Sequence, residues 1–448
     1  MSFEIKDIVE KRLGENYTLH DLYVNQALVK VLRTIGFDKV YKRAEGAYLW
    51  DQEGKDYLDF LGGYGAVNLG RNHPAIKKVL RDVLDLDLPN MVQMDCSLLS
   101  GLLAEALVKR APPHLKSVFL CNSGTEAVEG AIKFARCATG RDKLLYVDKA
   151  FHGLSTGSLA MNGSMKFKEG FGRLLESESV PLDDLAILEG KLRTGEFAAF
   201  FIEPIQGKGV HYPKDDAYWP RAQELCRKHG TLLVCDEIQT GLGRVGKWFG
   251  FQHWNLEPDI VCLAKSLSGG LVPCGAILTR REIYNKTFSR MDRCVVHSTT
   301  FGRNNLAMAC GLAALQVIEE EKIVENAERM GKRLIDGLLK LKEKHEFIAE
   351  VRGKGLMVAI EFSEPKSLKL RAAWKLIQAA EKGLFAQMVV IPLLKDHRIL
   401  TQVASHVVDV KPQRVRAEHS RQLSPVDHAE AISAGTFVES RAADVEGG

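Results

Sequence analysis

The sequence predicts an α/β protein built around a mainly parallel sheet with helices on both faces. Short apolar runs typical of buried strands alternate with helical patterns through the first two thirds of the chain. Such alternation packs as β–α–β units, and ligands bind at the carboxyl ends of their strands. The predicted strands are Ser117–Cys121, Leu144–Val147, Ala198–Ile202, Leu232–Asp236, Asp259–Leu263 and Cys274–Leu278.

Composition sets the class of protein. A chain of 448 residues is too long for one hydrophobic core and suits two or three domains. Apolar content of 46% and charged content of 26% are ordinary for a globular protein. The net charge of +4 gives no case for nucleic acid or a membrane surface, and no apolar run is long enough to span a bilayer. We therefore expect neither a nucleic-acid nor a membrane partner.

Cysteine usage indicates a reducing compartment. The nine cysteines include no Cys-x-x-Cys pair, which argues against a zinc site or a redox motif, so no metal is expected. The first residues, Met1–Asp7, are charged and lack the apolar stretch of a secretory signal. A cytoplasmic location fits these features best.

Other segments carry weaker patterns. Residues 1–45 are amphipathic and predict helices outside the main core, and an aromatic-rich hairpin is expected over residues 46–60. A helical pattern from Pro74 to Arg110 is broken near Pro89. One long helix is expected to contain Ala307, Cys310, Gly311 and Leu315 and to continue to Lys344, followed by strands at Val351–Ile360, Val389–Leu394 and Ile399–Val403.

Two strand ends carry the residues that suggest a cofactor. Asp236 closes one apolar run and Lys265 follows the next. Pyridoxal phosphate (PLP) needs a lysine that holds its aldehyde as a Schiff base and a carboxylate that faces its ring nitrogen. The pair therefore predicts PLP. The alternative interpretation of Lys265 is a surface lysine, which the surrounding motifs disfavour.

A third strand leads into Asn122-Ser123-Gly124-Thr125 and then a helix. Free N–H groups and two hydroxyls at a positive helix end form a phosphate site. Ser123 or Thr125 could also be ordinary N-caps, which need no ligand.

Two further loops are open to more than one interpretation. Phe151 and His152 follow a strand and could lie over a flat ring, but Phe151 could equally pack in the core. The glycine-rich segments 62–65 and 70–74 imply close backbone approach or are plain connections.

Taken together, several motifs in order resemble the class III aminotransferases, over roughly residues 40 to 405. This family belongs to the fold type I PLP enzymes and includes ornithine, acetylornithine, putrescine and 4-aminobutyrate aminotransferases. The motifs are Ser123–Ala127, Phe151–Gly153, Glu203–Gly207, Asp236–Gly241 and Ala264–Ser266, with further matches from Tyr48 to Pro74 and from Val351 to Leu356.

The resemblance implies a role for each site residue. Lys265 would form the Schiff base and move the proton between the substrate carbon and the cofactor, and Asp236 would keep the ring nitrogen protonated. The remaining cofactor contacts are assigned to Ser123, Gly124 and Thr125 (phosphate), Phe151 and Ile238 (ring faces), Gln239 (ring hydroxyl), His152, Glu203, and Thr300 (phosphate of the neighbouring subunit). A homodimer with shared active sites follows from the role of Thr300.

The same resemblance implies the domain organisation. A large PLP-binding domain with a seven-stranded, mainly parallel sheet is expected over residues 76–315. A smaller α+β domain would combine residues 1–75 with residues 316–405. Residues 406–448 form an atypical polar tail that departs from the family, so its usual carboxylate-binding arginine is not assigned.

Three residues are assigned to the substrate. Lys208 stands where most members carry a glutamate; it could attract a carboxylate or be a neutral change on a loop. Tyr64 resembles a tyrosine of the ornithine aminotransferase pocket, whereas Leu154 stands where that enzyme has an arginine. We therefore expect a donor with a terminal amine on an apolar or amine-bearing chain, such as a diamine or an ω-amino compound.

The predicted activity is a PLP-dependent transamination that moves an amino group from an amine, diamine or amino-acid donor to a 2-oxo acid by a ping-pong mechanism. A racemase, mutase or decarboxylase on the same fold is the alternative. A degenerate homologue that only binds ligands is a third possibility, which the intact Asp236 and Lys265 disfavour.

Overall fold

The structure, a computed structural model, describes residues 3–92, 94–367, 370–372, 374–375, 384–404 and 407–410. Contacts divide the chain into two compact units. One comprises Gly62–Lys332 with Gly353–Val358; the other comprises Met1–Leu61, Arg333–Arg352 and Ala359–Gly448, as far as these are described. The domain boundaries expected from the sequence stay a prediction, and the predicted tail lies almost entirely outside the described residues.

The larger unit contains a seven-stranded sheet in the order β4-β10-β9-β8-β7-β5-β6. All neighbouring pairs from β9 to β6 are parallel, whereas β10 runs antiparallel to both β4 and β9. The predicted mainly parallel sheet is confirmed. Its strands are β4 (Ser117–Cys121), β5 (Lys143–Val147), β6 (Ser177–Val180), β7 (Phe197–Ile202), β8 (Leu232–Asp236), β9 (Ile260–Leu263) and β10 (Gly275–Thr279).

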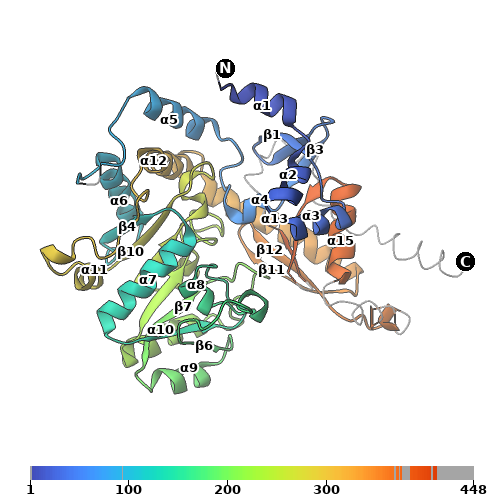
Figure 1. Ribbon diagram of the computed structural model, residues 1–448. Helices are drawn as coiled ribbons and strands as arrows, with labels where there is room; N and C mark the ends of the chain where they lie inside the picture. The colour runs from blue at the N-terminus through green and yellow to red at the C-terminus, as the bar shows by residue number, and fades with distance from the viewer. Residues whose placement is uncertain are drawn as a thin grey trace, which may run out of the picture. The chain divides into compact units, whose positions relative to one another are not determined.

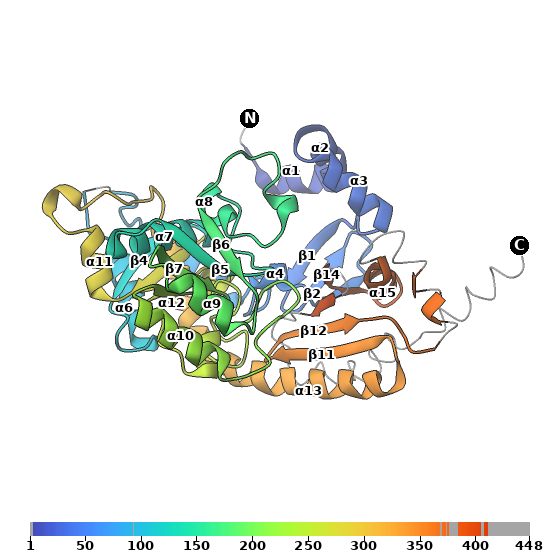
Figure 2. The same ribbon diagram turned by 90° about the horizontal axis from the view of Figure 1, so that it is seen from below.

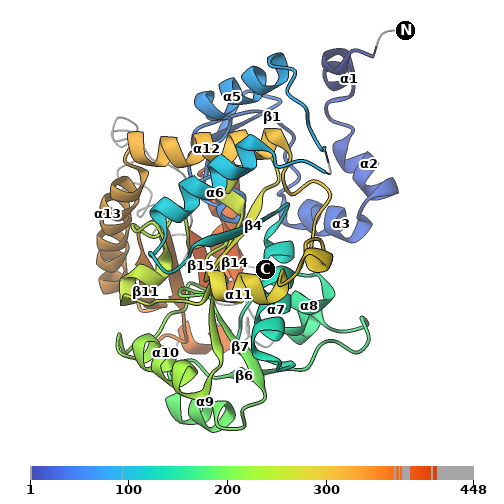
Figure 3. The same ribbon diagram turned by 90° about the vertical axis from the view of Figure 1, so that its left-hand side faces the viewer.

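Helices cover both faces of this sheet. Helix α7 (Gly124–Thr139) lies on one side of the strands and α10 (Tyr218–His229) on the other (Figures 1 and 3). The predicted helix face is buried against the sheet, where Val128, Ala131, Ile132 and Ala135 of α7 share a core cluster with side chains of six strands. The other helices of the unit are α4 (Gly62–Gly65), α5 (Pro74–Asp85), α6 (Leu98–Arg110), α8 (Thr156–Ala160), α9 (Leu185–Leu192), α11 (Arg281–Thr287) and α12 (Asn305–Glu320), with short 3-10 turns at Met165–Phe167, Gly250–Trp254, Lys265–Ser268 and Met291–Arg293.

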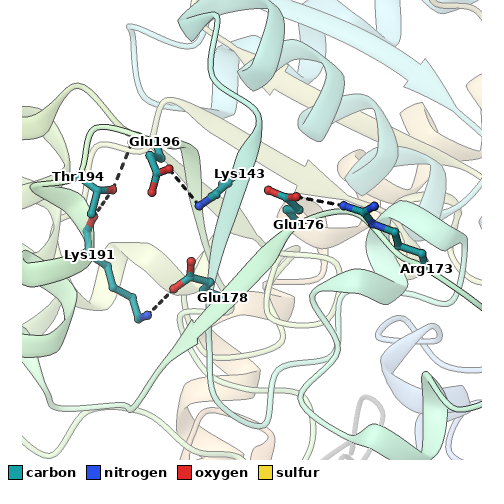
Figure 4. Close-up of polar contacts among 7 residues, drawn as sticks. All are labelled: Lys143, Arg173, Glu176, Glu178, Lys191, Thr194 and Glu196. Atoms are coloured by element: carbon teal, nitrogen blue, oxygen red, sulfur yellow. Dashed lines mark hydrogen bonds and ion pairs between the residues drawn. The ribbon is translucent and has the colours of Figure 1, made fainter.

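Strand β6 is an edge of the seven-stranded sheet, and charged side chains surround it. Glu178 on β6 accepts a hydrogen bond from Lys191, and Glu176 just before the strand pairs with Arg173 (Figure 4). Lys143 on the neighbouring β5 pairs with Glu196. Charges at an edge strand oppose pairing with a strand of another chain.

The smaller unit has two four-stranded sheets, in the orders β1-β2-β3-β13 and β11-β12-β15-β14. The predicted hairpin is confirmed as β2 and β3, which pair antiparallel. Figure 2 shows β11 and β12 side by side, with α13 along them. The elements that lie wholly in this unit are α1 (Ile5–Arg12), α2 (Asn16–Tyr23), α3 (Gln26–Ile35), β1 (Tyr41–Glu45), β2 (Tyr48–Asp51), β3 (Asp56–Asp59), α15 (Leu384–Lys395), β13 (Ile399–Leu400), β14 (Gln402–Ala404) and β15 (Val407–Val410). Three more have one end in the segments assigned to the larger unit: α13 (Ile323–Lys344), β11 (Ile348–Lys354) and β12 (Met357–Phe362).

Three predictions for the C-terminal third are wrong. The single long helix is two helices, because Lys322 between α12 and α13 adopts a positive φ of 50° that ends a helix. The strand predicted at 351–360 is two strands separated by Gly355, whose φ is 53°. The strand predicted at 389–394 belongs to helix α15, because a short apolar run fits a buried helix as well as a strand.

Candidate active site

Asp236 and Lys265 lie at the same edge of the seven-stranded sheet. Asp236 is the last residue of β8 and pairs in register with Cys262 of the parallel neighbour β9, which ends two residues before Lys265. The carboxyl ends of parallel strands meet at one edge, so the structure brings the acid and the amine together as expected. Lys265 has a φ of 47°, a left-handed conformation that is rare for a side-chain-bearing residue and is common at functional sites.

A buried histidine holds the carboxylate of Asp236. His152 Nδ1 lies 2.8 Å from Asp236 Oδ2, and Asp236 Oδ1 accepts a hydrogen bond from the backbone N–H of Ile238. Burial favours the neutral imidazole, but the hydrogen bond to Asp236 and the charges of Asp236 and Glu203 outweigh it and raise the pKa of His152. His152 and the N–H of Ile238 therefore fix the orientation of the Asp236 carboxylate.

Glu203 joins two of the loops around the site. It follows β7, and its carboxylate accepts hydrogen bonds from the backbone N–H groups of Phe151 at 2.9 Å and Gly207 at 2.7 Å. Burial raises the pKa of Glu203, partly offset by the charge of His152 and by the two N–H donors. Glu203 thus fixes the positions of the 151–153 and 206–208 segments relative to each other.

The first turn of α7 presents the predicted phosphate loop. Ser123 is the N-cap, and its Oγ accepts from the N–H of Glu126, as the N-cap interpretation expects. Thr125 Oγ1 lies 2.7 Å from Ser158 Oγ and accepts from the N–H of Ser155. The N–H groups of a first helical turn have no partner inside the helix, so this end of α7 remains suited to an anion.

Ile238 and Gln239 line the space between the phosphate loop and Glu203. A Cβ on Gly124 would lie 2.9 Å from Ile238 Cδ1, so Ile238 packs directly on the loop. A Cβ on Gly207 would lie 2.8 Å from Gln239 Oε1. That oxygen is buried and has no hydrogen-bond partner among the described residues, whereas Gln239 Nε2 donates to the carbonyl of Tyr64.

The glycine-rich loop at 62–68 is tied to both catalytic strand ends. Tyr64 has a φ of 57° and an exposed side chain, and its carbonyl accepts from Gln239. The next carbonyl, of Gly65, accepts a hydrogen bond of 2.9 Å from Ser266 Oγ, beside Lys265. The structure therefore places the backbone of residues 64 and 65 against Gln239 and Ser266, and the close backbone approach expected of the glycines is present. Leu154 is also exposed, one residue past Gly153.

Lys208 lies against two aromatic rings. Its Nζ is 4.1 Å from the ring centroid of Phe151 and 3.9 Å from that of Phe167. Burial lowers the pKa of Lys208, and the charge of Glu203 opposes this shift. Such cation–π contacts stabilise a partly desolvated ammonium.

Thr300 lies apart from these residues within the chain. It is exposed and lines a surface pocket with residues of the segment before α6 and the start of α12. The other lining residues are Pro89, Met91, Val92, Asp95, Ser97, Arg303 and Asn305.

Three residues around the site were not predicted from the sequence. Phe167 and Ser158 come from segments without a motif, so no sequence signal indicated them. Glu237 accepts hydrogen bonds from Thr240 Oγ1 and from the N–H groups of Gly250 and Phe251. Burial raises the pKa of Glu237 to about 7 despite these donors. Its place directly after Asp236 was the only available signal.

These residues fit PLP. The site offers a carboxylate for the ring nitrogen, an amine for the aldehyde, a helix N-terminus for the phosphate and an amide with an unpaired buried oxygen. The side chains of Ile238 and Gln239 pack directly against the glycines at 124 and 207, where a Cβ would displace them. Fold and site together define a PLP-dependent enzyme of fold type I.

Comparison with known proteins specifies the family. The family model described as aminotransferase class-III matches residues 34–396, and the chain belongs to this family. The predicted family, its PLP dependence and its aminotransferase chemistry are confirmed at that level, and nothing favours the racemase, mutase or decarboxylase alternative.

Individual relatives agree with this assignment. Aminotransferase PigE of Serratia sp. (strain ATCC 39006) is 36% identical over 426 residues, which are 87% of this chain and 50% of PigE. The chain therefore spans about half the length of this curated relative. The structure of ornithine aminotransferase from Toxoplasma gondii ME49 is 28% identical, with a TM-score of 0.84 over 98% of this chain and 100% of that one. Taurine:2-oxoglutarate aminotransferase from Bifidobacterium kashiwanohense, solved with PLP and glutamate, is 25% identical, with a TM-score of 0.83 over 94% of this chain and 98% of that one.

None of the helices in the described part of the chain has the length and apolar character that crossing a bilayer requires.

Proposed function

We propose that this protein transfers an amino group from an amine or amino-acid donor to a 2-oxo acid by a ping-pong mechanism. The observation that carries the proposal is the hydrogen-bonded pair of Asp236 and His152 at the sheet edge that also presents Lys265. Bound PLP would supply an electron sink that stabilises negative charge on the substrate carbon. The residues of the chain would supply the anchor, the proton transfers and the orientation.

Lys265 is proposed as both anchor and base. Its amine would hold the cofactor covalently between turnovers and would move a proton to and from the substrate carbon. Asp236 would face the ring nitrogen and favour its protonated form, and His152 orients the Asp236 carboxylate through their hydrogen bond.

The remaining residues orient the cofactor. Ser123, Gly124 and Thr125 bind its phosphate at the positive end of α7. Phe151 and Ile238 would pack on the two ring faces, and Gln239 would hydrogen-bond the ring hydroxyl. Glu203 supports this arrangement through its bond to the Phe151 backbone.

The donor is proposed to carry its amine at the end of an apolar or ω-functionalised chain. Tyr64 is fixed near the catalytic segments by the bonds of its loop, and Leu154 offers an apolar side chain rather than a charged one. A donor whose carboxylate had to meet a cation at position 154 would find no partner there.

The protein is proposed to act as a homodimer in the cytoplasm. Thr300 is exposed beside apolar side chains that a monomer would leave in water, including Val295, Phe301 and Met94, which are 71%, 60% and 98% exposed. Exposed apolar patches of this kind mark association surfaces. A second copy would cover them and bring Thr300 to the partner's phosphate loop.

Spectroscopy of the purified holoenzyme tests the function directly. Candidate amines are added without an acceptor, and loss of the visible absorbance of the lysine-bound cofactor reports the first half-reaction. Adding a 2-oxo acid should restore that absorbance and release the corresponding amino acid. Carbon dioxide or an inverted stereocentre as the only product would contradict the proposal.

A further inference from the structure

The ammonium of Lys208 lies next to the candidate active site and forms no ion pair with a carboxylate among the described residues. Among the described residues, no acidic side chain lies within ion-pair distance of Lys208, and its contacts are the ring faces of Phe151 and Phe167. Resting on the function proposed above, we propose that Lys208 is a specificity-determining residue that binds a carboxylate of the substrate.

The surroundings of Lys208 leave its charge uncompensated. Glu203 interacts electrostatically with Lys208. However, both carboxylate oxygens of Glu203 already accept hydrogen bonds from the backbone N–H groups of Phe151 and Gly207. A ring face attracts a cation but cannot accept a hydrogen bond of ordinary strength. The three N–H donors of this ammonium are therefore available to a ligand.

Its position borders the space assigned to the reacting groups. Lys208 follows Gly207, which packs against the amide of Gln239, and its Nζ lies over Phe151. A carboxylate bound to this ammonium would gain charge-assisted hydrogen bonds and neutralise a partly buried charge. The two rings would hold the ammonium in place while no anion is bound.

The proposal narrows the substrate class. A diamine would bring a second ammonium toward Lys208, and two like charges at close range repel. An ω-amino acid or a dicarboxylic 2-oxo acid would bring a carboxylate instead. The structure therefore favours carboxylate-bearing substrates over diamines in at least one half-reaction.

Three variants of the holoenzyme test the role of Lys208. Lys208→Gln removes the charge and Lys208→Arg keeps it. Lys166→Gln removes the charge of an exposed lysine that precedes Phe167, one of the two rings that Lys208 contacts. Glutarate, which is not an amino donor or acceptor, is titrated by calorimetry and by its effect on the cofactor absorbance. We expect Lys208→Gln to weaken glutarate binding by about tenfold or more, the loss of one charge-assisted hydrogen bond. Lys208→Arg and Lys166→Gln should bind it much as the parent does.

The half-reactions then show which substrate supplies the carboxylate. In the donor arm, 4-aminobutyrate is compared with butylamine; in the acceptor arm, 2-oxoglutarate is compared with pyruvate. If Lys208 acts on the donor, Lys208→Gln should slow 4-aminobutyrate and leave butylamine unchanged. If it acts on the acceptor, Lys208→Gln should slow 2-oxoglutarate, which has a second carboxylate, and leave pyruvate unchanged.

Two results would overturn the proposal. One is glutarate affinity that is unchanged in Lys208→Gln. The other is a loss of glutarate affinity in Lys208→Gln that is matched by an equal loss of PLP affinity. In that case Lys208 would only hold Phe151 in position. Phe167→Leu separates these roles, because it removes a ring, keeps the ammonium and should preserve glutarate binding. Failure of the function itself would look different, since no amine would then change the cofactor absorbance.

Discussion

The imidazole of His152 and the carboxylate of Asp236 share a fully enclosed hydrogen bond of 2.8 Å between Nδ1 and Oδ2. The bond joins the loop after β5 to the end of β8 across the intervening β7. Asp236, the carboxylate proposed to face the pyridine ring of PLP, therefore has a hydrogen-bond partner in His152 even without the cofactor.

His152→Ala should weaken cofactor binding without unfolding the protein. Asp236 Oδ2 would lose its donor inside the site, and loss of a hydrogen bond to a charged group corresponds to about a tenfold weaker affinity. Fluorescence titration of the apoprotein with PLP measures the change. His20→Ala, at an exposed position of α2, is the control and should bind PLP as the parent does.

Lys265→Ala should abolish transamination and the visible absorbance of the lysine-bound cofactor. The amine is both the covalent anchor and the base, so no neighbouring group can replace it. Absorbance spectra and product analysis measure the two losses, with circular dichroism as the check on folding. Turnover that persisted in this variant would refute the assignment of Lys265.

Gly207→Ala should disturb the site through Gln239. The added Cβ would lie 2.8 Å from Gln239 Oε1 and 3.0 Å from Glu203 Oε2, so both side chains would have to move. We expect weaker PLP binding by about tenfold, the scale of one displaced hydrogen bond to a charged ligand. Gly190→Ala in helix α9 is the matched control, because its Cβ meets nothing within 4 Å and alanine favours a helix. Equal PLP affinity in the two variants would contradict the packing described for Gly207.

Glu237 predicts a pH dependence of stability. Its pKa is about 7 in the folded protein against an ordinary value of 4.5, so between these values the folded state keeps a proton that the unfolded state has released. The free energy of unfolding therefore falls as pH rises from about 4.5 to about 7, by up to roughly 3 kcal/mol. Urea denaturation at a series of pH values measures the slope. Glu237→Gln should flatten it, and an unchanged slope would show that other groups cause it.

The proposed contact of Thr300 with the neighbouring subunit leads us to expect that PLP binding depends on dimer formation. If Thr300 contacts the partner's phosphate, Thr300→Ala should release PLP more readily while the dimer persists, as light scattering and dialysis would show. The expected loss is about fivefold to tenfold, corresponding to one hydrogen bond to a charged group. PLP affinity that is identical in Thr300→Ala and the parent would remove Thr300 from the site.

Much of the sheet and of the site geometry could be predicted from the sequence. Asp236 and Lys265 follow apolar runs with clear boundaries, and parallel pairing alone then places them at one edge. The bond between His152 and Asp236 could not be predicted, because it joins loops far apart in the chain. Phe167 was missed for the same reason, since a ring in a motif-free segment carries no signal of the lysine it will contact.

The C-terminal third shows the limit of apolar patterns. The apolar run within α15 is compatible with either a strand or a buried helix. The two can be told apart by length only when the residues before the run are known to belong to the same element. The breaks at Lys322 and Gly355 are single residues with positive φ. Only Gly355 is a glycine, the residue type that commonly adopts positive φ and could therefore have indicated a break.

The loop at 62–68 has a consequence for engineering. Its carbonyls at Tyr64 and Gly65 serve as acceptors for Gln239 and Ser266, which flank the proposed cofactor site. A loop transplanted from a relative with another substrate would have to supply both acceptors at the same places. Where it did not, the exchange would cost cofactor retention before it changed selectivity, so redesign at this position is safest by side-chain replacement on the existing backbone.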